Sequence, residues 1–213
     1  MHYQKIIIMT KSFKNKNYCV AGIDAETGKW VRIVSDDEDT LGALTDRDLI
    51  YMDRTACQVM DIAQFPILKK VPTKQQPENI LLCRGPFIGK SGTARLEDVL
   101  KIHPAENHRF LFGNRYNAIK EEYLEERGVD YSLALVKVDH LVFDYKQNNE
   151  GKTKFKASFV YNGITYEGMS VTDPEYYDNE EHGEIPSAHI IVSIGAPYNG
   201  KHYKFIARII PMS

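Results

Sequence analysis

The stretch ILLCRGPFIGKSGTARLEDVL, which begins at residue 80, is the part of the sequence closest to a phosphate-binding loop. An apolar run, two glycines and a Lys-Ser pair precede a helix-like pattern, as in P-loop NTPases. That motif has four residues between its glycines, but only three separate Gly85 from Gly89, and Arg84 occupies the first glycine's place. Pro86 also lacks an N–H for a phosphate. We therefore expect a Gly/Pro loop with a basic rim, formed by Arg84 and Lys90, and not an NTPase site.

Other residues capable of catalysis or metal binding are isolated. His182 lies among glutamates without a paired ligand motif, and Pro104 separates His103 from His108, which breaks the helical face that spaced ligands need. The sequence contains no G-x-S-x-G elbow. We expect a protein that is not an enzyme and that uses no metal or other cofactor.

Aromatic residues that alternate with basic ones are more informative. Strand alternation places Trp30 and Arg32 on one face of KWVRIVS, and Tyr203 and Phe205 on one face of KHYKFIAR. A third run, KTKFKASFVY, has Phe155, Phe159 and Tyr161 opposite Lys154 and Lys156. Stacking surfaces with a basic rim are typical of proteins that bind single-stranded nucleic acid. The alternative is that these aromatic rings fill the interiors of β-barrels.

The elements that would position these residues are mostly strands. The run NYCVAGI, a turn around Glu26 to Gly28 and the run KWVRIVS predict a β-hairpin. Asn162-Gly163, between two β-rich runs, predicts a type I′ hairpin turn, since both central residues of that turn need positive φ. A similar hairpin is expected around Asn199-Gly200. The run CQVMDIAQFPIL predicts a strand that stops or bends at Pro66.

The middle of the chain has helical patterns. TARLEDVLKIHP predicts a helix capped by Thr93 and ended by Pro104, and NRYNAIKEEYLEERG predicts one capped by Asn114 and ended by Gly128. We expect a mainly β fold with a few helices, built from two small β-barrels. The first would span residues 1–130, with a helical extension over about 91–128, and the second residues 131–213.

Composition limits the classes of protein that this chain could belong to. Net charge is −2 and the pI is about 6.4, which argues against coating nucleic acid through bulk positive charge but permits a local basic groove. No run approaches the roughly 20 apolar residues of a membrane span. The N-terminal residues lack the features of a signal peptide, and the three cysteines form no C-x-x-C pair. We expect a cytoplasmic protein that does not act at a membrane.

Four strings together resemble the bacterial dual OB-fold-containing domain family: YCVAGIDAETGKWVRIVS, QPENILL, ASFVYNGITYEGMSVTDPE and IIVSIGAPYNGKHYKFIARII. They occur in order over nearly the whole chain. The family pattern has a proline in its first string where this sequence has Ile33.

The resemblance implies two OB-like barrels in tandem and a nucleic-acid-binding role, some members being placed in prokaryotic defence or conflict systems. Single-stranded nucleic acid is the favoured partner, with the choice between RNA and DNA open. The residues that the resemblance and the alternation assign to nucleic-acid or ligand binding are Trp30, Arg32, Ser35, Asn79, Thr172, Asp173, Ser193, Tyr203 and Lys204. Thr172 and Asp173 could instead only set a turn before Pro174.

Two other functions remain open. The slightly negative net charge also suits a module that binds a partner protein. A cleft between two barrels could instead hold a small molecule or a modified nucleotide, because domain interfaces often contain such sites.

Overall fold

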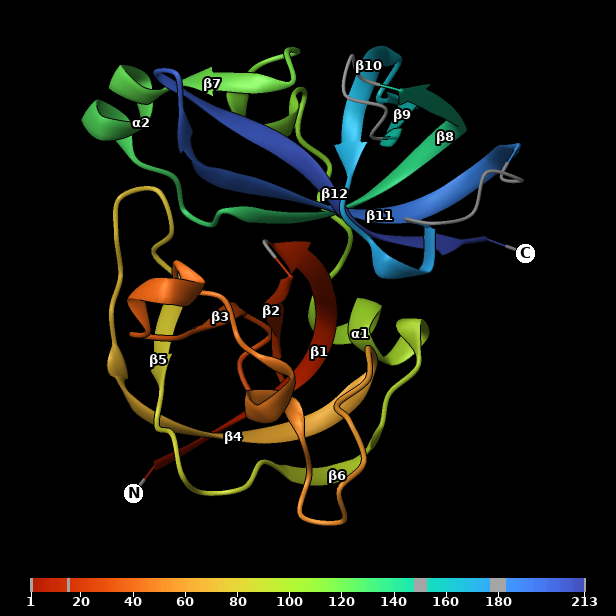
Figure 1. The fold of residues 1–213 in the computed structure, drawn as a ribbon. Coiled ribbons are helices and arrows are strands. Elements are labelled where there is room, and N and C mark those ends of the chain that lie inside the picture. The colour runs from red at the N-terminus through yellow and green to blue at the C-terminus, as the bar shows by residue number, and fades with distance from the viewer. Residues whose placement is uncertain (1, 15, 148–152, 177–182, 213) are drawn as a thin grey trace. The chain divides into compact units, whose positions relative to one another are not determined.

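The computed structural model describes residues 2–14, 16–147, 153–176 and 183–212. The chain divides into two compact units, Met1–Pro104 and Ala105–Ser213 (Figure 1). Each unit is built around one β-sheet, and its helices are short.

The first unit is a closed five-strand barrel. Its strands are β1 (His2–Lys14), β2 (Asn17–Asp24), β3 (Trp30–Val34), β4 (Asp61–Lys70) and β5 (Asn79–Leu82). They follow the order β1-β2-β3-β5-β4, and β4 pairs again with β1 to close the barrel. A short sixth strand, β6 (Gly89–Thr93), extends the sheet beside β4. Strands β3 and β5 are parallel, and the other pairs are antiparallel.

The second unit repeats this topology with longer strands. They are β8 (Leu133–Gln147), β9 (Thr153–Tyr161), β10 (Ile164–Val171), β11 (Glu184–Tyr198) and β12 (Lys201–Pro211). Their order is β8-β9-β10-β12-β11, closed by the pair β11–β8, and β10 and β12 are parallel. A short strand, β7 (Ala118–Lys120), pairs with the start of β12. Both units are therefore OB-like barrels, and the expected mainly β fold is confirmed.

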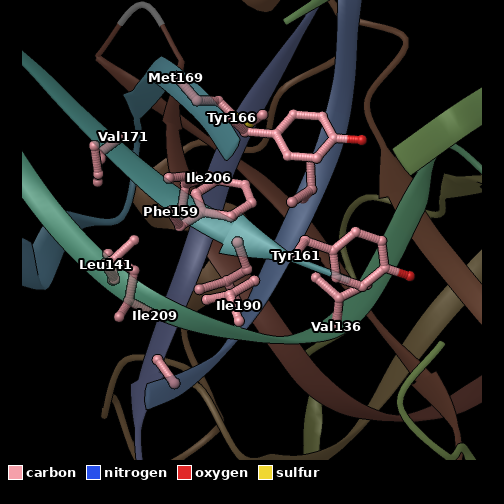
Figure 2. Packing of buried hydrophobic residues seen from close by; sticks show 14 of the residues in the cluster. Val136, Leu141, Phe159, Tyr161, Tyr166, Met169, Val171, Ile190, Ile206 and Ile209 are labelled. Carbon is pink, nitrogen blue, oxygen red and sulfur yellow. The ribbon is translucent and has the colours of Figure 1, made fainter. Parts of the chain in front are cut away.

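The interior of the second barrel contains several aromatic residues. Phe159 and Tyr161 of β9 pack with Tyr166 and the aliphatic side chains of β8, β11 and β12 (Figure 2). Phe155 of the same strand belongs to this buried cluster. The rings of Phe159 and Tyr166 stack with centroids 5.4 Å apart. The structure therefore supports the second interpretation of the sequence, in which the rings of Phe155, Phe159 and Tyr161 fill the barrel interior.

The hairpin turns follow the sequence signals. Asn162 and Gly163 have φ of 49° and 73°, and Asn199 and Gly200 have 51° and 69°, as type I′ turns require. The turn between β2 and β3 lies at residues 25–28, where the Asp24 N–H donates to the Lys29 carbonyl. In β4, the strand continues through Pro66 to Lys70 with a bulge between Ile67 and Lys69.

Both predicted helices are shorter than their sequence patterns suggested. Helix α1 (Leu96–Ile102) begins after Arg95, because Thr93 belongs to β6 and pairs with Asp61. Helix α2 (Glu121–Arg127) begins after Lys120, because Ala118–Lys120 is β7. Asn114 therefore caps no α-helix. It ends the short 3-10 turn Leu111–Gly113.

The two units meet at Pro104 and Ala105, whereas the sequence analysis placed the join near residue 130. The difference arises because β7 pairs with β12, so the segment with β7 and α2 groups with the second barrel. Within the described part of the chain, no helix is long and apolar enough to cross a membrane.

Candidate functional site

Trp30 begins β3 and is 2% exposed. Its ring meets the imidazole of His103 edge-on, with centroids 5.1 Å apart, and His103 Nδ1 is hydrogen-bonded to the Gly28 carbonyl at 2.8 Å. The sequence analysis assigned Trp30 to base stacking, but the structure leaves almost none of its ring accessible.

Arg32 and Asn79 lie opposite each other on the parallel strands β3 and β5. Arg32 Nε is 3.2 Å from Glu78 Oε1, and both side chains are buried. The Asn79 amide donates to Gln76 Oε1 at 3.2 Å. Because a carboxylate already faces Arg32, its charge is compensated inside the protein.

Ser35 lies just after β3, in a cluster of charged residues. Its hydroxyl accepts hydrogen bonds from the Asp37 N–H and from Arg84, and Arg84 also pairs with Asp37 and Asp48 at 3.1 and 3.2 Å. A hollow of about 500 Å³ beside these residues is lined by Asp37, Asp46, Asp48 and Arg84, among others. Arg84 therefore does not form the free basic rim expected of this loop.

Lys90, the other cation of that loop, is bound to Asp61 at 2.6 Å. Asp61 also accepts from the Tyr51 hydroxyl at 2.9 Å and from the Gln58 N–H. Burial raises the pKa of the nearby Cys57 thiol to about 11, so the thiol is protonated at neutral pH and is a poor nucleophile. These contacts make the cluster part of the packing at one end of the first barrel.

The histidines singled out in the sequence are separate in the structure. His103 is bound to Gly28, as above, and His108 Nε2 is 3.5 Å from Glu106 Oε2. His182 lies outside the described residues. Among the residues that are described, no three His, Cys, Asp or Glu side chains are grouped as metal ligands.

Lys204 of β12 is 1% exposed and points toward the segment before β7. Its Nζ donates to the Leu111 carbonyl at 2.7 Å and to the carbonyl and side-chain oxygens of Asn114 at 3.0 and 2.9 Å. Burial lowers the pKa of Lys204 to about 7. The sequence analysis assigned Lys204 to nucleic-acid or ligand binding, but all three ammonium hydrogens already have acceptors within the protein.

Asp173 and Ser193 are also buried. Asp173 follows β10 and accepts from the Ile209 N–H at 2.8 Å and from Arg208 at 3.2 Å. Ser193 lies on β11, in register with Phe205 and Leu133. Asp173 thus fixes the chain after β10, which favours the structural alternative over direct binding for this residue.

A pocket of about 460 Å³ opens on the second barrel, between β9, β10 and β12. These strands correspond to strands two, three and five of an OB barrel, and strands two and three carry the usual ligand face. None of the described residues that line it is an aspartate or a glutamate. The lining residues are Asn117, Phe155, Lys156, Gly168, Met169, Ser170, Val171, Thr172, Tyr203, Lys204 and Phe205.

The outer face of β12 leads into this pocket. Lys201 and Tyr203 are exposed and Phe205 is half-buried, and all three lie on the same side of the strand because they are two residues apart. Tyr203 is 37% exposed and its ring centroid is 6.4 Å from that of Tyr198. The Phe205 ring lies against Gly195, where an added Cβ would come within 2.4 Å of Phe205 Cε2.

Thr172, Tyr203 and Lys204 are therefore the predicted site residues that the pocket brings together. The four from the first barrel, Trp30, Arg32, Ser35 and Asn79, lie elsewhere. The sequence analysis did not select Lys156, Ser170, Phe205 or Asn117. The alternation in KHYKF gave a signal for Phe205, but nothing in the sequence placed Asn117 beside β12.

A model of the dual OB-containing domain family matches residues 4–209. The chain belongs to this family. A comparison with curated protein sequences found no match.

Two of the strings that carried the resemblance to the dual OB-containing family converge on the pocket. The residues SVTDP, near the end of the third string, include Ser170 and Thr172, which line the pocket. They also include Asp173, which accepts a hydrogen bond from the Ile209 N–H of β12. The string from Val192 to Lys204 supplies Tyr203, Lys204 and the Gly195 backbone on which Phe205 lies. In the first barrel, the corresponding string supplies the buried Trp30 and Arg32.

Proposed function

We propose that the chain binds single-stranded nucleic acid through the second barrel, at a surface made of Lys201, Tyr203 and Phe205 on β12 together with Lys156 on β9. The observation that carries the proposal is the row on β12: one cation is followed by two aromatic rings on one face, and the row leads into a pocket whose described lining residues include no carboxylate. Aromatic rings that stack bases and cations that meet phosphates are the components of such sites. OB folds commonly bind oligonucleotides on this face.

The cations at this surface form no ion pairs with the acidic residues that the structure describes, although Asp144 of β8 lies opposite Lys156 of β9. No aspartate or glutamate in the described part of the chain forms an ion pair with Lys156, Lys120 or Lys201. Lys120 and Lys201 lie directly opposite each other on β7 and β12, and both are exposed. Facing like charges destabilise a strand pair. A phosphate between them would remove this repulsion, which supports an anionic ligand.

The first barrel differs in this respect. Arg32 pairs with Glu78, Arg84 with Asp37 and Asp48, and Lys90 with Asp61. The three cations of this barrel that the sequence analysis considered for binding are thus compensated by protein carboxylates. This contrast is the reason for assigning nucleic-acid binding to the second barrel and for moving the proposed site away from Trp30.

The test is fluorescence anisotropy with labelled single-stranded RNA, single-stranded DNA and duplex DNA, at several salt concentrations. For single strands, each phosphate neutralised contributes about −0.7 to the slope of log K against log salt. Lys156→Ala and Lys201→Ala should each weaken binding and make that slope shallower. Tyr203→Ala should weaken binding with no change in slope, since stacking involves no counterion.

Matched controls come from the first barrel. Lys70→Ala and Tyr3→Ala remove an exposed lysine and an exposed tyrosine from β4 and β1, and should leave affinity unchanged. Equal losses from the control and test lysines would indicate diffuse charge attraction. No binding to any of the polymers at low salt would refute the proposal and leave a partner protein or a small ligand as the function. A cytoplasmic location and a place in a defence system remain predictions from the sequence and the family resemblance.

A further inference from the structure

The pocket on the second barrel exists because two parallel strands separate. Strands β10 and β12 are in register only at Ser170–Phe205 and Val171–Ile206. Before these residues, β10 pairs with β9, and β12 pairs with β7. A gap therefore opens on the N-terminal side of the paired residues, and the pocket lies in that gap, lined by Gly168 to Thr172 on one side and by Tyr203 to Phe205 on the other.

Asn117 crosses this gap at its far end. Its backbone carbonyl accepts a hydrogen bond from the Lys204 N–H of β12 at 2.8 Å. Its side-chain amide donates to the Glu167 carbonyl of β10. Asn117 thus joins the two strands where their own pairing has ended. The pocket is thus lined both by residues where the two strands pair, such as Ser170 and Phe205, and by Asn117, which bridges the strands beyond that pairing.

The segment that contains Asn117 is fixed in place. Lys204 Nζ holds the backbone at Leu111 and Asn114, and the Tyr166 hydroxyl donates to the Asn114 carbonyl at 3.1 Å. The Leu111 N–H in turn donates to the Tyr166 hydroxyl at 2.9 Å. The wall at this end is therefore part of the barrel and not a loose loop.

The groups around the pocket suit one nucleotide. The Phe205 ring gives a flat apolar surface, and the Ser170 hydroxyl can donate to or accept from the edge of a base. The Thr172 hydroxyl donates to the Ile206 carbonyl at 3.3 Å, so it can serve a base as an acceptor. The Lys156 stem packs against Gly168, where an added Cβ would be 3.8 Å from Lys156 Cδ and 4.0 Å from Nζ. Its ammonium therefore lies beside Gly168, which also lines the pocket. Sites for a base taken out of a strand combine the same stacking and edge contacts, and about 460 Å³ is within the range of small-ligand sites.

We propose that this pocket receives a single nucleotide, with its base against Phe205 and its phosphate at Lys156, while the neighbouring part of the strand follows Tyr203, Lys201 and Lys120. This inference deepens the proposed function and rests on it. Its consequence is that a free nucleoside monophosphate binds the pocket without the rest of the strand and competes with an oligonucleotide for it.

The experiment is competition between a labelled single-stranded oligonucleotide and the monophosphates of adenosine, guanosine, cytidine and uridine, read by anisotropy and by isothermal titration calorimetry. Adenosine, ribose 5-phosphate and inorganic phosphate are the control ligands. At least one monophosphate should compete saturably, and about tenfold or more better than its own nucleoside, because a charge-assisted contact at Lys156 is lost with the phosphate. Lys156→Ala should remove that difference between nucleotide and nucleoside.

A variant that fills the pocket gives an independent test. Ser170→Tyr should abolish monophosphate binding and reduce oligonucleotide binding without eliminating it, since Tyr203 and Lys201 remain. Ser91→Tyr, on the exposed strand β6, is the matched control, and thermal unfolding shows whether either variant folds. If Ser170→Tyr does not fold, Lys156→Ala on the folded protein still decides the question.

The outcomes separate this inference from the proposed function. An oligonucleotide that binds while no monophosphate competes at millimolar concentration would overturn the pocket assignment alone. Competition by ribose 5-phosphate or phosphate as strong as that of the nucleotides would also overturn it, since no base would be read. Monophosphate binding without any oligonucleotide binding would instead refute the single-strand proposal and support the pocket.

Discussion

Asp173 and Arg208 form an ion pair beside the parallel strands β10 and β12 of the second barrel, with Asp173 Oδ1 and Arg208 Nη1 3.2 Å apart. Arg32 and Glu78 do the same at the parallel strands β3 and β5 of the first barrel, with the acidic and basic residues exchanged between the two strands. Each parallel pair is short: three residues are in register in the first barrel and two in the second. An ion pair beside each parallel pair adds contacts between two strands that have few residues in register.

Asp173→Ala should therefore destabilise the second barrel strongly. The change leaves Arg208 without its buried partner and the Ile209 N–H without its acceptor, and breaking a buried pair from one side typically costs about 3–5 kcal/mol. Urea unfolding followed by circular dichroism measures the loss. Glu175→Gln is the control, because Glu175 also contacts Arg208 but its side chain is 62% exposed, so the free energy of unfolding should change far less. Equal effects of the two variants would contradict a special role for the buried carboxylate.

Much of the fold could be predicted from local signals. Turn residues such as Asn162-Gly163 need only their own backbone preference, and the alternation in KASFVY fixes which side chains face the interior. Helix boundaries were less predictable. Residues 118–120 lie in a helical pattern but pair with β12, a partner about eighty residues later in the chain. The same non-local pairing moved the boundary between the units to Pro104.

The candidate site was predictable only in part. Residue type suggested that Trp30, Arg32 and Lys204 were binding residues, yet each of them is buried, where Arg32 is paired and Lys204 is hydrogen-bonded. Whether a cation forms an ion pair inside the protein depends on a residue far away in the sequence, as Glu78 is from Arg32. The alternation of residue types along one strand does not identify that partner. Tyr203 was selected correctly as a surface aromatic, because the period of a strand does predict which residues share its face.

Gly195→Ala should weaken nucleic-acid binding through Phe205. A Cβ at this position would come within 2.4 Å of Phe205 Cε2, so the ring must move from its place beside the pocket. We expect an affinity loss approaching that of Phe205→Ala, since stacking on one ring contributes about 1–3 kcal/mol. Anisotropy measures the loss. A double variant, Gly195→Ala with Phe205→Ala, should be no weaker than Phe205→Ala alone, and additive losses would show that Gly195 acts independently of the ring.

Lys204→Met should change how stability depends on pH. Burial lowers the folded-state pKa of Lys204 to about 7, whereas the unfolded value is near 10.4. Between these values the unfolded chain binds the proton and the folded chain does not, so the Lys204 contribution to stability rises with pH. The wild type should gain stability relative to Lys204→Met by up to about 1.4 kcal/mol per pH unit from pH 7 to pH 10.

Chemical denaturation of the two proteins across this pH range measures that difference. Lys137→Met is the control, since Lys137 is exposed, and its difference from wild type should not follow the same trend. A constant difference between wild type and Lys204→Met would mean that the hydrogen bonds to Leu111 and Asn114 keep the ammonium charged in the folded protein despite its burial.

Trp30 and Tyr203 should respond oppositely to substitution. Trp30→Phe removes part of a buried side chain in the first barrel, so it should lower the free energy of unfolding, by roughly 1–3 kcal/mol, and leave nucleic-acid affinity and its salt dependence unchanged. Tyr203→Ala changes an exposed ring and should leave stability nearly unchanged while reducing affinity by roughly 1–3 kcal/mol. Because the sequence contains one tryptophan, its fluorescence in the wild type gives a direct check. A buried Trp30 should resist quenching by iodide, both with and without oligonucleotide. Loss of affinity in Trp30→Phe at full stability would return the site to the first barrel.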